Sequence, residues 1–455
     1  MSRNDNGCKI VITGMGSVNP LGDLIDSSFN NLINGDLYPL NQVDKIKRFD
    51  FSSFPSHIAF HVNDEIISRM QNKYFSAIST LNDLFLLHSL ETALIDSNLK
   101  NRLPYVIYLG AESGLISYEN IFRYYKTGEV DSLSYSLRSP NELLKRVVEY
   151  IWKDNKNSFS ELSKKINIIS LACAGSTAAI AYAYQKLKDE IIYRKIRGES
   201  VNNLWAIAGG TIAAINPHFL TGFSLLGALS KKNDNPKLAS RPFDQNRDGF
   251  VLGEGAGIII LESYESACNR GAKIYAEIVG WGAASDAHKM TDPHPEGKGA
   301  ARAIKNCLKN AQVMPTQIDY INAHGTSTYQ NDLLESKAIA QVFQSQSQTQ
   351  TQTQTQTQNE KSPLISSHKS MIGHLIAASG VVESIFVIKS LQTQKIPANY
   401  NLNKLDSEIE KLNLNFVGNK SITSNLNIKY ALKNSFAFGG HNYSLLFKRS
   451  CNECK

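Results

Sequence analysis

The chain has 455 residues, of which 42% are hydrophobic and 20% charged, and this balance excludes a mainly disordered or fibrous protein. The formal net charge of +7 comes from Lys and Arg residues scattered along the chain, which favours an acidic protein partner over nucleic acid. The first residues lack a signal-peptide pattern and no apolar run reaches about eighteen residues, so we expect a cytoplasmic protein that does not bind or span a membrane.

Short apolar, β-branched runs alternate with helical stretches, and their order repeats once along the chain. The runs lie at residues 9–13, 105–109, 166–172, 204–209 and 253–261, and again at 273–279, 318–323, 364–367, 431–436 and 442–448. The first run of each half leads into a glycine-punctuated segment, 14–16 or 280–282. Strands alternating with helices imply mostly parallel or mixed sheets covered by helices. We therefore predict one layered α/β body of two pseudo-repeated halves, residues 1–264 and 265–455.

A low-complexity segment interrupts the second half. Residues 344–358 alternate Gln with Ser or Thr and contain nothing apolar to bury. Since such a segment cannot offset its ordering entropy, we predict a disordered surface loop without a catalytic role.

The six cysteines are dispersed, and a reducing compartment would keep them as thiols. Cys451 and Cys454 have C-x-x-C spacing, but no second pair or nearby His completes a zinc site. We interpret them as part of a polar tail.

One cysteine has a setting suited to chemistry. Cys173 follows the predicted strand 166–172 and precedes a helix rich in small residues, 174–192. The free amides and dipole of a helix N-terminus favour a thiolate, which is the nucleophilic form. Taken alone, an isolated intracellular cysteine is more often an inert core residue.

Three further residues change that balance. His324 directly follows the predicted strand 318–323, and His374 lies at a strand-to-helix junction with Lys369 five residues before it. A thiolate, two imidazoles and a lysine at strand ends are more than a core requires. Nucleophilic catalysis on an acyl group becomes the favoured class of activity.

Four segments carry a resemblance to a known family: residues 241–255, 322–328, 368–374 and 434–440. The second reads Asn-Ala-His-Gly-Thr-Ser-Thr and the fourth Asn-Ser-Phe-Ala-Phe-Gly-Gly. The chain resembles the β-ketoacyl-acyl carrier protein synthases, closest to the type II elongating condensing enzymes. The resemblance implies a thiolase-like αβαβα fold and a 3-oxoacyl-[acyl-carrier-protein] synthase of fatty acid elongation.

The same resemblance implies a division of labour in the site. Cys173 would accept the acyl chain as a thioester, and malonyl-acyl carrier protein would then lose carbon dioxide and attack it. His324 and His374 would flank the malonyl thioester carbonyl, with Lys369 as electrostatic support. The backbone amides of Cys173 and Phe438 would form an oxyanion hole, and the Phe438 ring would gate entry.

Two acidic residues, Asp332 and Glu335, resemble the family's supporting carboxylates, although a local ion-pair network explains such a pair nearly as well. Ala437 stands where the family usually has Gly, and Gly227 where close relatives often have an Arg for the acidic carrier. Four other cationic residues are candidates to replace that Arg as contacts of the carrier: Arg69, Lys73, Lys231 and Lys232. Residues 118–160 match the family poorly, which leaves acyl chain length open.

Three alternatives remain: a ketosynthase of a specialised polyketide or polyene pathway, a non-catalytic chain-length factor, and a thiolase. Chain-length factors usually lose the cysteine, and thiolases typically use a second cysteine with one histidine. No dinucleotide fingerprint, P-loop or metal-spaced cluster is present, so we expect no cofactor and no metal. By resemblance we expect acyl- and malonyl-loaded carrier protein as partners, and a homodimer.

Overall fold

The computed structural model describes residues 8–35, 43–46, 48, 50–74, 80–111, 147, 150–152, 158–344 and 362–450. Ten strands there form one mixed sheet, and each of the ten predicted strands has a counterpart among them. They are β1 (Ile10–Val18), β4 (Val106–Gly110), β5 (Ile166–Ile169), β6 (Trp205–Ile212), β8 (Gly255–Ser263), β9 (Ala276–Ser285), β10 (Tyr320–Asn322), β11 (Leu364–Ser366), β12 (Tyr430–Ala437) and β13 (His441–Arg449). A small second sheet was not predicted: β2 (Val43–Lys45), β3 (Ile58–Phe60) and β7 (Leu252–Gly253).

The order of the ten strands is symmetrical about its middle. It runs β11-β10-β12-β13-β9-β1-β8-β6-β4-β5, and β1 joins β9 through a short antiparallel pairing. Outward from that joint, each side has two antiparallel pairs followed by two parallel pairs. β5 and β11 therefore hold equivalent edge positions, and each is followed by a segment with predicted reactive side chains. The boundary at residues 264 and 265 stays a prediction.

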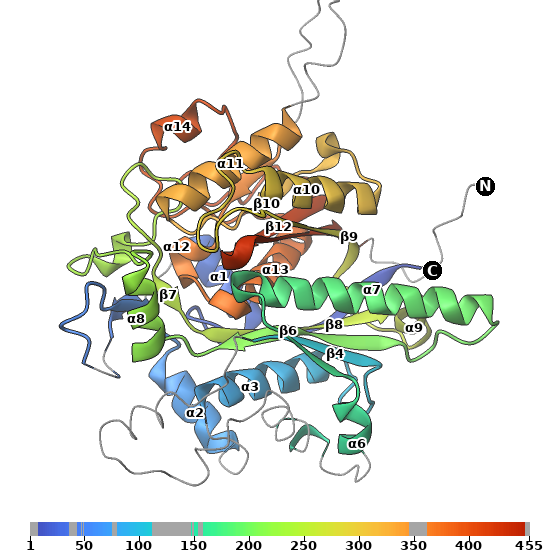
Figure 1. The fold of residues 1–455 in the computed structure, drawn as a ribbon. Helices are drawn as coiled ribbons and strands as arrows, with labels where there is room; N and C mark the ends of the chain where they lie inside the picture. The colour runs from blue at the N-terminus through green and yellow to red at the C-terminus, as the bar shows by residue number, and fades with distance from the viewer. Residues whose placement is uncertain are drawn as a thin grey trace, which may run out of the picture.

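Helices cover and separate the strands in layers (Figure 1). They are α1 (Ile25–Asn34), α2 (Asp64–Tyr74), α3 (Leu81–Asp96), α6 (Ser158–Ser163), α7 (Gly175–Ile196), α8 (Pro217–Leu225), α9 (Tyr264–Asn269), α10 (Lys298–Ala311), α11 (Tyr329–Phe343), α12 (Lys369–Ile372), α13 (Ile376–Thr393) and α14 (Ser407–Glu410). α3 packs on the outer face of β1 and β8, and α10 on that of β9 and β13. α7 and α13 pack on each other and on strands of both sides. This is the predicted layered α/β fold.

The central helix α13 corrects one expectation. By length and composition alone it is apolar enough to cross a membrane, and the sequence was expected to contain no such run. However, 83% of this 18-residue helix is buried inside the protein. It is also the helix behind the reactive side chains, so its apolar character reflects a central position in the core.

The glycines after the first predicted strand serve helix packing. β1 continues through them to Val18 instead of ending. A Cβ on Gly14 would lie 2.6 Å from the Ala93 carbonyl oxygen, and one on Gly16 would lie 2.0 Å from that of Ser89. Both carbonyls belong to α3, so the missing side chains let this helix approach the strand closely.

The cysteines only partly follow expectation. Cys8, Cys173 and Cys307 are free thiols, but Cys268 is disulfide-bonded, so the expectation of thiols throughout is wrong. Complete burial raises the pKa of the Cys307 thiol, which makes it an unreactive core residue. The C-terminal residues 451–455 lie outside the described residues, as do residues 345–358 of the Gln-rich segment and most of 118–160.

Candidate active site

The predicted nucleophile lies at the turn between β5 and α7. Cys173 is the middle residue of the 3₁₀ turn η2 (Ala172–Ala174), and it is 3% exposed. Ala172 has a φ of 44°, in the left-handed region that is costly for a residue with a side chain and is concentrated at functional sites. The strained turn places the cysteine at the start of a 22-residue helix, where the helix dipole favours a thiolate.

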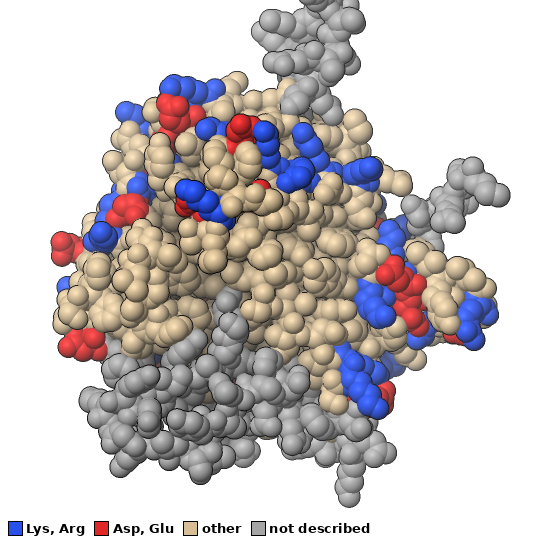
Figure 2. Space-filling view, in the orientation of Figure 1, with Lys and Arg blue, Asp and Glu red and all other residues tan. Residues whose placement is uncertain are grey.

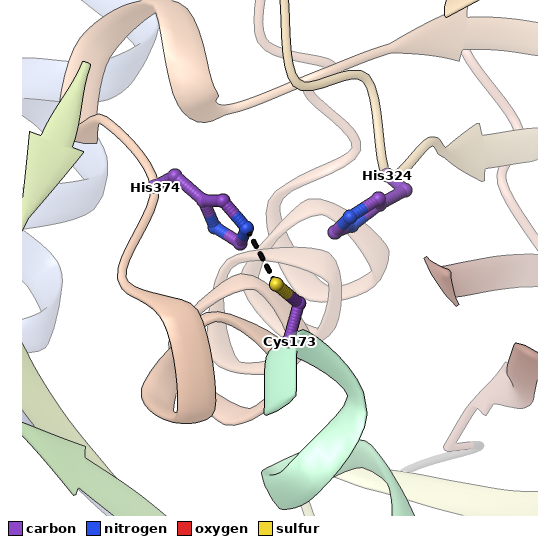
Figure 3. A group of neighbouring side chains, drawn as sticks. All are labelled: Cys173, His324 and His374. Carbon is purple, nitrogen blue, oxygen red and sulfur yellow. Dashed lines mark hydrogen bonds between the residues drawn. The ribbon is translucent and has the colours of Figure 1, made fainter. Parts of the chain in front are cut away.

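His374 is hydrogen-bonded to the thiol (Figure 3). Its Nε2 lies 2.9 Å from Cys173 Sγ, and its Nδ1 lies 2.9 Å from the hydroxyl of Ser379 in α13. The backbone of His374 is fixed in turn, because its amide donates to the Val251 carbonyl at 2.8 Å. A ring protonated at Nε2 satisfies both side-chain contacts, since the Ser379 hydroxyl can donate to Nδ1.

His324 comes from the same half of the sheet as His374, opposite the half that carries Cys173. It follows β10, and its ring centroid lies 5.3 Å from that of His374, at an interplanar angle of 80°. Its Nδ1 is buried and has no hydrogen-bond partner among the described residues. Burial lowers the pKa of both histidines well below the usual value, and the Lys369 ammonium lowers both further. Both imidazoles are therefore neutral at physiological pH.

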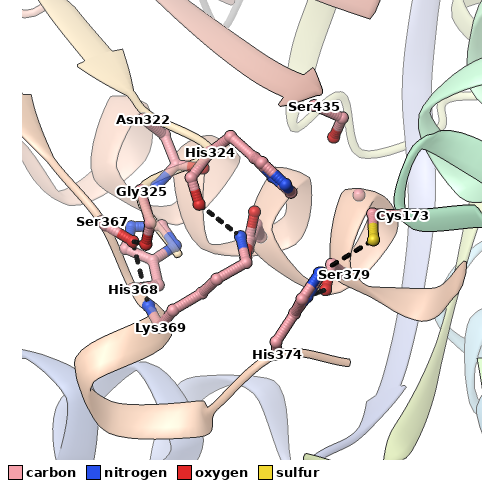
Figure 4. Close-up of polar contacts among 12 residues, drawn as sticks. Cys173, Asn322, His324, Gly325, Ser367, His368, Lys369, His374, Ser379 and Ser435 are labelled. Atoms are coloured by element: carbon pink, nitrogen blue, oxygen red, sulfur yellow. Dashed lines mark hydrogen bonds and ion pairs between the residues drawn. The ribbon is translucent and has the colours of Figure 1, made fainter. Parts of the chain in front are cut away.

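Lys369 connects His324 to the central helix (Figure 4). Its side chain is 1% exposed, and its Nζ donates to the His324 carbonyl oxygen at 2.7 Å and to Glu383 Oε1 at 2.5 Å. Glu383 projects from α13, so a buried ion pair ties the loop after β10 to the helix behind the site. Such pairs position side chains even where they add little net stability.

The two predicted acidic residues lie on α11 and bind backbone amides. Glu335 accepts hydrogen bonds from the amides of His324 and Gly325, both at 2.8 Å. Burial raises the pKa of Glu335 to about 7, against the lowering effect of those bonds. Asp332 accepts from the Phe243 amide at 2.8 Å and lies 3.7 Å from Arg247. Glu335 thus holds the start of the histidine loop, whereas Asp332 accepts from the Ser327 amide of that loop at 3.2 Å and joins it to Arg247.

The chain matches two family models: Beta-ketoacyl synthase, N-terminal domain, over residues 167–267, and Beta-ketoacyl synthase, C-terminal domain, over residues 275–403. The 3-oxoacyl-[acyl-carrier-protein] synthase 2 of Vibrio harveyi is 34% identical over 448 residues, which cover 97% of this chain and 98% of that protein. The chain belongs to the β-ketoacyl synthase family.

Solved structures of ketosynthases share the fold. A beta-ketoacyl synthase from Burkholderia phymatum STM815 is 29% identical with a TM-score of 0.78, covering 97% of this chain and 99% of its own. A ketosynthase in complex with its type II polyketide acyl-carrier protein is 28% identical with a TM-score of 0.77, covering 98% and 100%. The predicted family and thiolase-like fold are confirmed.

In this β-ketoacyl synthase a cavity of about 410 Å³ is lined by Cys173 and both histidines. The predicted gate, Phe438, also lines it, within the 3₁₀ turn η5 (Phe438–Gly440). Its ring stacks on Phe223 with centroids 6.3 Å apart. Phe223 meets Phe250, whose centroid lies 5.1 Å from that of His374. A continuous row of aromatic rings therefore runs from Phe438 to His374.

The departures from the family pattern fit the backbone locally. Ala437 is extended, with φ −120° and ψ 156°, so its Cβ causes no backbone strain. Gly439 and Gly440 have φ values of 81° and 72°, which glycine adopts at little cost. Gly227 also has a positive φ of 64° and lines the cavity.

Two residues of this site were not predicted from the sequence, Glu383 and Lys433. Glu383 is a lone carboxylate in an apolar helix, and Lys433 is a lone ammonium in the buried strand β12. Both are 0% exposed, and they form an ion pair at 2.8 Å. An isolated charge inside an apolar pattern is the signal that was available, because a chain buries a charge only when another group compensates it.

The ligand atoms of Cys173, His324 and His374 all lie within 4.8 Å of one another, so the three residues could also hold a metal ion. Two ammonium groups, those of Lys369 and Lys433, lower the pKa of both histidines and act in the same way against a divalent cation. We therefore interpret the group as a site for anionic intermediates, and the absence of a metal stays a prediction.

Proposed function

We propose that this β-ketoacyl synthase extends acyl chains by two carbons on an acyl carrier protein, as a 3-oxoacyl-[acyl-carrier-protein] synthase. The Cys173 thiolate attacks the acyl thioester, and the carrier thiolate leaves and takes a proton from solvent. Malonyl-carrier protein then enters and its carboxylate leaves as carbon dioxide. The resulting enolate carbon attacks the acyl-enzyme carbonyl and releases Cys173 as a thiolate. The observation that carries this proposal is the contact between Cys173 and His374 beside His324.

The two neutral imidazoles suit the decarboxylation step. Loss of carbon dioxide places negative charge on the oxygen of the malonyl thioester, and neutral N–H groups donate to it without carrying charge themselves. The Nε2 proton assigned to His374 stabilises first the thiolate and then the enolate. Lys369 and Glu335 act by holding the His324 loop. The backbone amides of Cys173 and Phe438 are proposed to bind the oxyanion of each tetrahedral intermediate.

An acyl carrier protein is the proposed macromolecular substrate. A solved ketosynthase with the same fold forms a complex with an acyl-carrier protein, which supports this. Three of the four cations suggested as carrier contacts already face carboxylates, Arg69 at 2.5 Å, Lys73 at 2.8 Å and Lys232 at 3.5 Å. Lys231 is exposed and is the best placed of the four to contact an acidic carrier.

We also propose a homodimer, formed through the face that carries α7. Among the described residues β5 pairs only with β4, which leaves its other edge available. Half-buried apolar side chains gather near it: Ile169, Leu171, Tyr182 and Trp281. Figure 2 shows few charged side chains over the middle of this face. Light scattering on the purified protein tests this, and a monomer at micromolar concentration would contradict it.

Two further properties are proposed, the lack of a cofactor and the cellular location. Acyl transfer and decarboxylation of a malonyl thioester need no redox group or metal, so we propose an enzyme without a cofactor. Because the apolar helix of membrane-spanning length found among the described residues is packed inside the protein, we propose a cytoplasmic location.

Intact mass spectrometry tests the reaction directly. The purified protein and Cys173→Ala are incubated with acyl-carrier proteins of several chain lengths, followed by malonyl-carrier protein. An acyl adduct on the natural protein alone, discharged into a β-ketoacyl product, is the expected result. Absence of an adduct at every chain length would instead favour a non-catalytic partner subunit.

The same series separates two enzymatic readings. Efficient single extension of saturated acyl chains of several lengths indicates fatty acid synthesis, which the 34% identical relative supports. Preference for unsaturated or poly-β-keto chains indicates a specialised polyketide or polyene pathway, the class of the 28% identical solved ketosynthase.

A further inference from the structure

Lys433 is a fully buried lysine for which the proposed reaction has no role. It lies in β12 and is 0% exposed, between β10 on one side and β13 on the other. A buried ammonium without a compensating group is strongly unfavourable. Here its Nζ forms an ion pair with Glu383 Oε2 at 2.8 Å and donates to the Ser435 hydroxyl at 3.0 Å and to the Asn434 carbonyl.

These contacts lead toward the nucleophile. The Ser435 hydroxyl is hydrogen-bonded to the Thr177 hydroxyl, with oxygens 2.7 Å apart, and both residues are fully buried. Thr177 lies in the first turn of α7, four residues after Cys173. A chain of three polar side chains therefore links β12 to the first turn of α7, the helix that follows the sulfur.

The contacts also bring together more buried ammonium groups than carboxylates. Glu383 is shared by two ammonium groups, Lys369 on Oε1 and Lys433 on Oε2. Within this triad, one carboxylate and two ammonium groups carry a net charge of +1. Burial lowers the pKa of Lys433, and the carboxylates of Glu383 and Glu335 oppose that lowering. Burial would raise the pKa of Glu383, but the two lysines hold it below its usual value, so the carboxylate stays charged. A buried excess of positive charge beside a thiol is most stable when that thiol is a thiolate.

We propose that Lys433 is a positioning residue that holds the nucleophile helix through Ser435 and supplies the active site with its net positive charge. The charge is compensated when Cys173 is a thiolate and again when the enolate forms. The inference rests on the proposed role of Cys173 and deepens it, since Lys433 would set how readily that thiol ionises.

Other ionisable groups around the cysteine stay unchanged in the test below: His324, His374, Lys369, Glu335 and the cavity-lining Asp248, Asp286 and Asp292. The two histidines are neutral over the working range because burial lowers their pKa well below the usual value. Glu335, whose pKa burial raises to about 7, titrates within the range and is present in every variant compared.

Alkylation of Cys173 by iodoacetamide, measured between pH 5 and 10 by intact mass, reports thiolate formation. Lys433→Met removes the excess charge and keeps the apolar stem. We expect the midpoint of the alkylation profile to rise by about one pH unit, with about tenfold slower alkylation at pH 7. Lys448→Met in the adjacent strand β13 is the matched control, because Lys448 pairs with Glu277 at 3.5 Å away from the site. It should leave the profile unchanged.

A double variant separates charge from shape. Lys433→Met combined with Glu383→Gln restores a net charge of +1, so its midpoint should return toward that of the natural protein. A purely structural role predicts a larger defect in the double variant than in the single one. Should Lys433→Met fail to fold by circular dichroism, Lys433→Gln replaces it, because glutamine can still donate to the Asn434 carbonyl.

An unchanged midpoint in the folded single variant, or no recovery in the double variant, would overturn the role of Lys433. Failure of the natural protein to form an acyl adduct would overturn the proposed function instead, so the two failures are distinguishable.

Discussion

The ammonium of Lys369 and the backbone carbonyl of His324 are joined by a hydrogen bond of 2.7 Å. The histidine is thereby held from two directions, because Glu335 binds its amide on the other side. The lysine is too deeply buried to act on solvent or on an incoming carrier. Its effect must pass through the position of the histidine and through its charge.

Lys369→Ala should therefore impair decarboxylation more than acyl transfer. The His324 carbonyl and Glu383 each lose a donor, and we expect about 100-fold slower release of carbon dioxide from malonyl-carrier protein, while an acyl adduct on Cys173 still forms. Radiolabelled carbon dioxide and intact mass measure the two steps separately. Lys389→Ala is the control, since Lys389 pairs with Asp26 at 2.6 Å elsewhere on α13. Equal losses in both steps would contradict the argument.

Glu335 makes stability depend on pH. Its pKa is about 7 in the folded protein and has a usual value of 4.5, so the folded state binds the proton more tightly than the unfolded state. Stability from this group is greatest below about pH 4.5 and falls as the pH rises to about 7, by up to roughly 3 kcal/mol. Thermal unfolding of the natural protein and of Glu335→Gln, measured from pH 5 to 8, should show a smaller decline in the variant. Parallel curves would refute this.

The gate depends on a left-handed glycine. Gly439 has a φ of 81°, and a Cβ there would lie 2.9 Å from the ring of His441. We expect Gly439→Ala to cost about 1–2 kcal/mol of folding stability and to slow acylation of Cys173 by displacing Phe438. Denaturant unfolding and the rate of adduct formation measure these effects. Gly418→Ala is the matched control, because a Cβ there meets nothing within 4 Å.

The ring of Phe438 should protect the acyl-enzyme from water. Phe438→Ala opens the cavity and removes the stacking on Phe223, so we expect faster hydrolysis of the acyl adduct and several-fold faster alkylation of Cys173. Leu225→Ala, at a residue 84% exposed, should change neither rate. Slower alkylation of Phe438→Ala would show that the ring positions the reagent instead of excluding it.

Periodicity in the sequence predicted every strand of the large sheet, because buried strands are continuous apolar runs bounded by turns. It also placed Cys173 and His374 at equivalent strand-to-helix junctions, where core packing does not explain a reactive side chain. It did not predict the contact of Lys433 with Glu383, since these residues come from a strand and a helix that meet only in the folded layers. The packing role of Gly14 and Gly16 was not predicted for the same reason, because only the position of α3 explains it.

The symmetry of the strand order has a consequence for how the activity arises. Cys173 lies two residues before α7, and His374 lies two residues before α13. One architectural unit, used twice, has thus delivered the thiol from one copy and its imidazole partner from the other. Neither copy alone contains both members of the reacting pair. Alkylation of Cys173 near neutral pH at a rate above that of an unfolded cysteine should therefore require docking of the two copies, which makes that enhanced rate a reporter of their association.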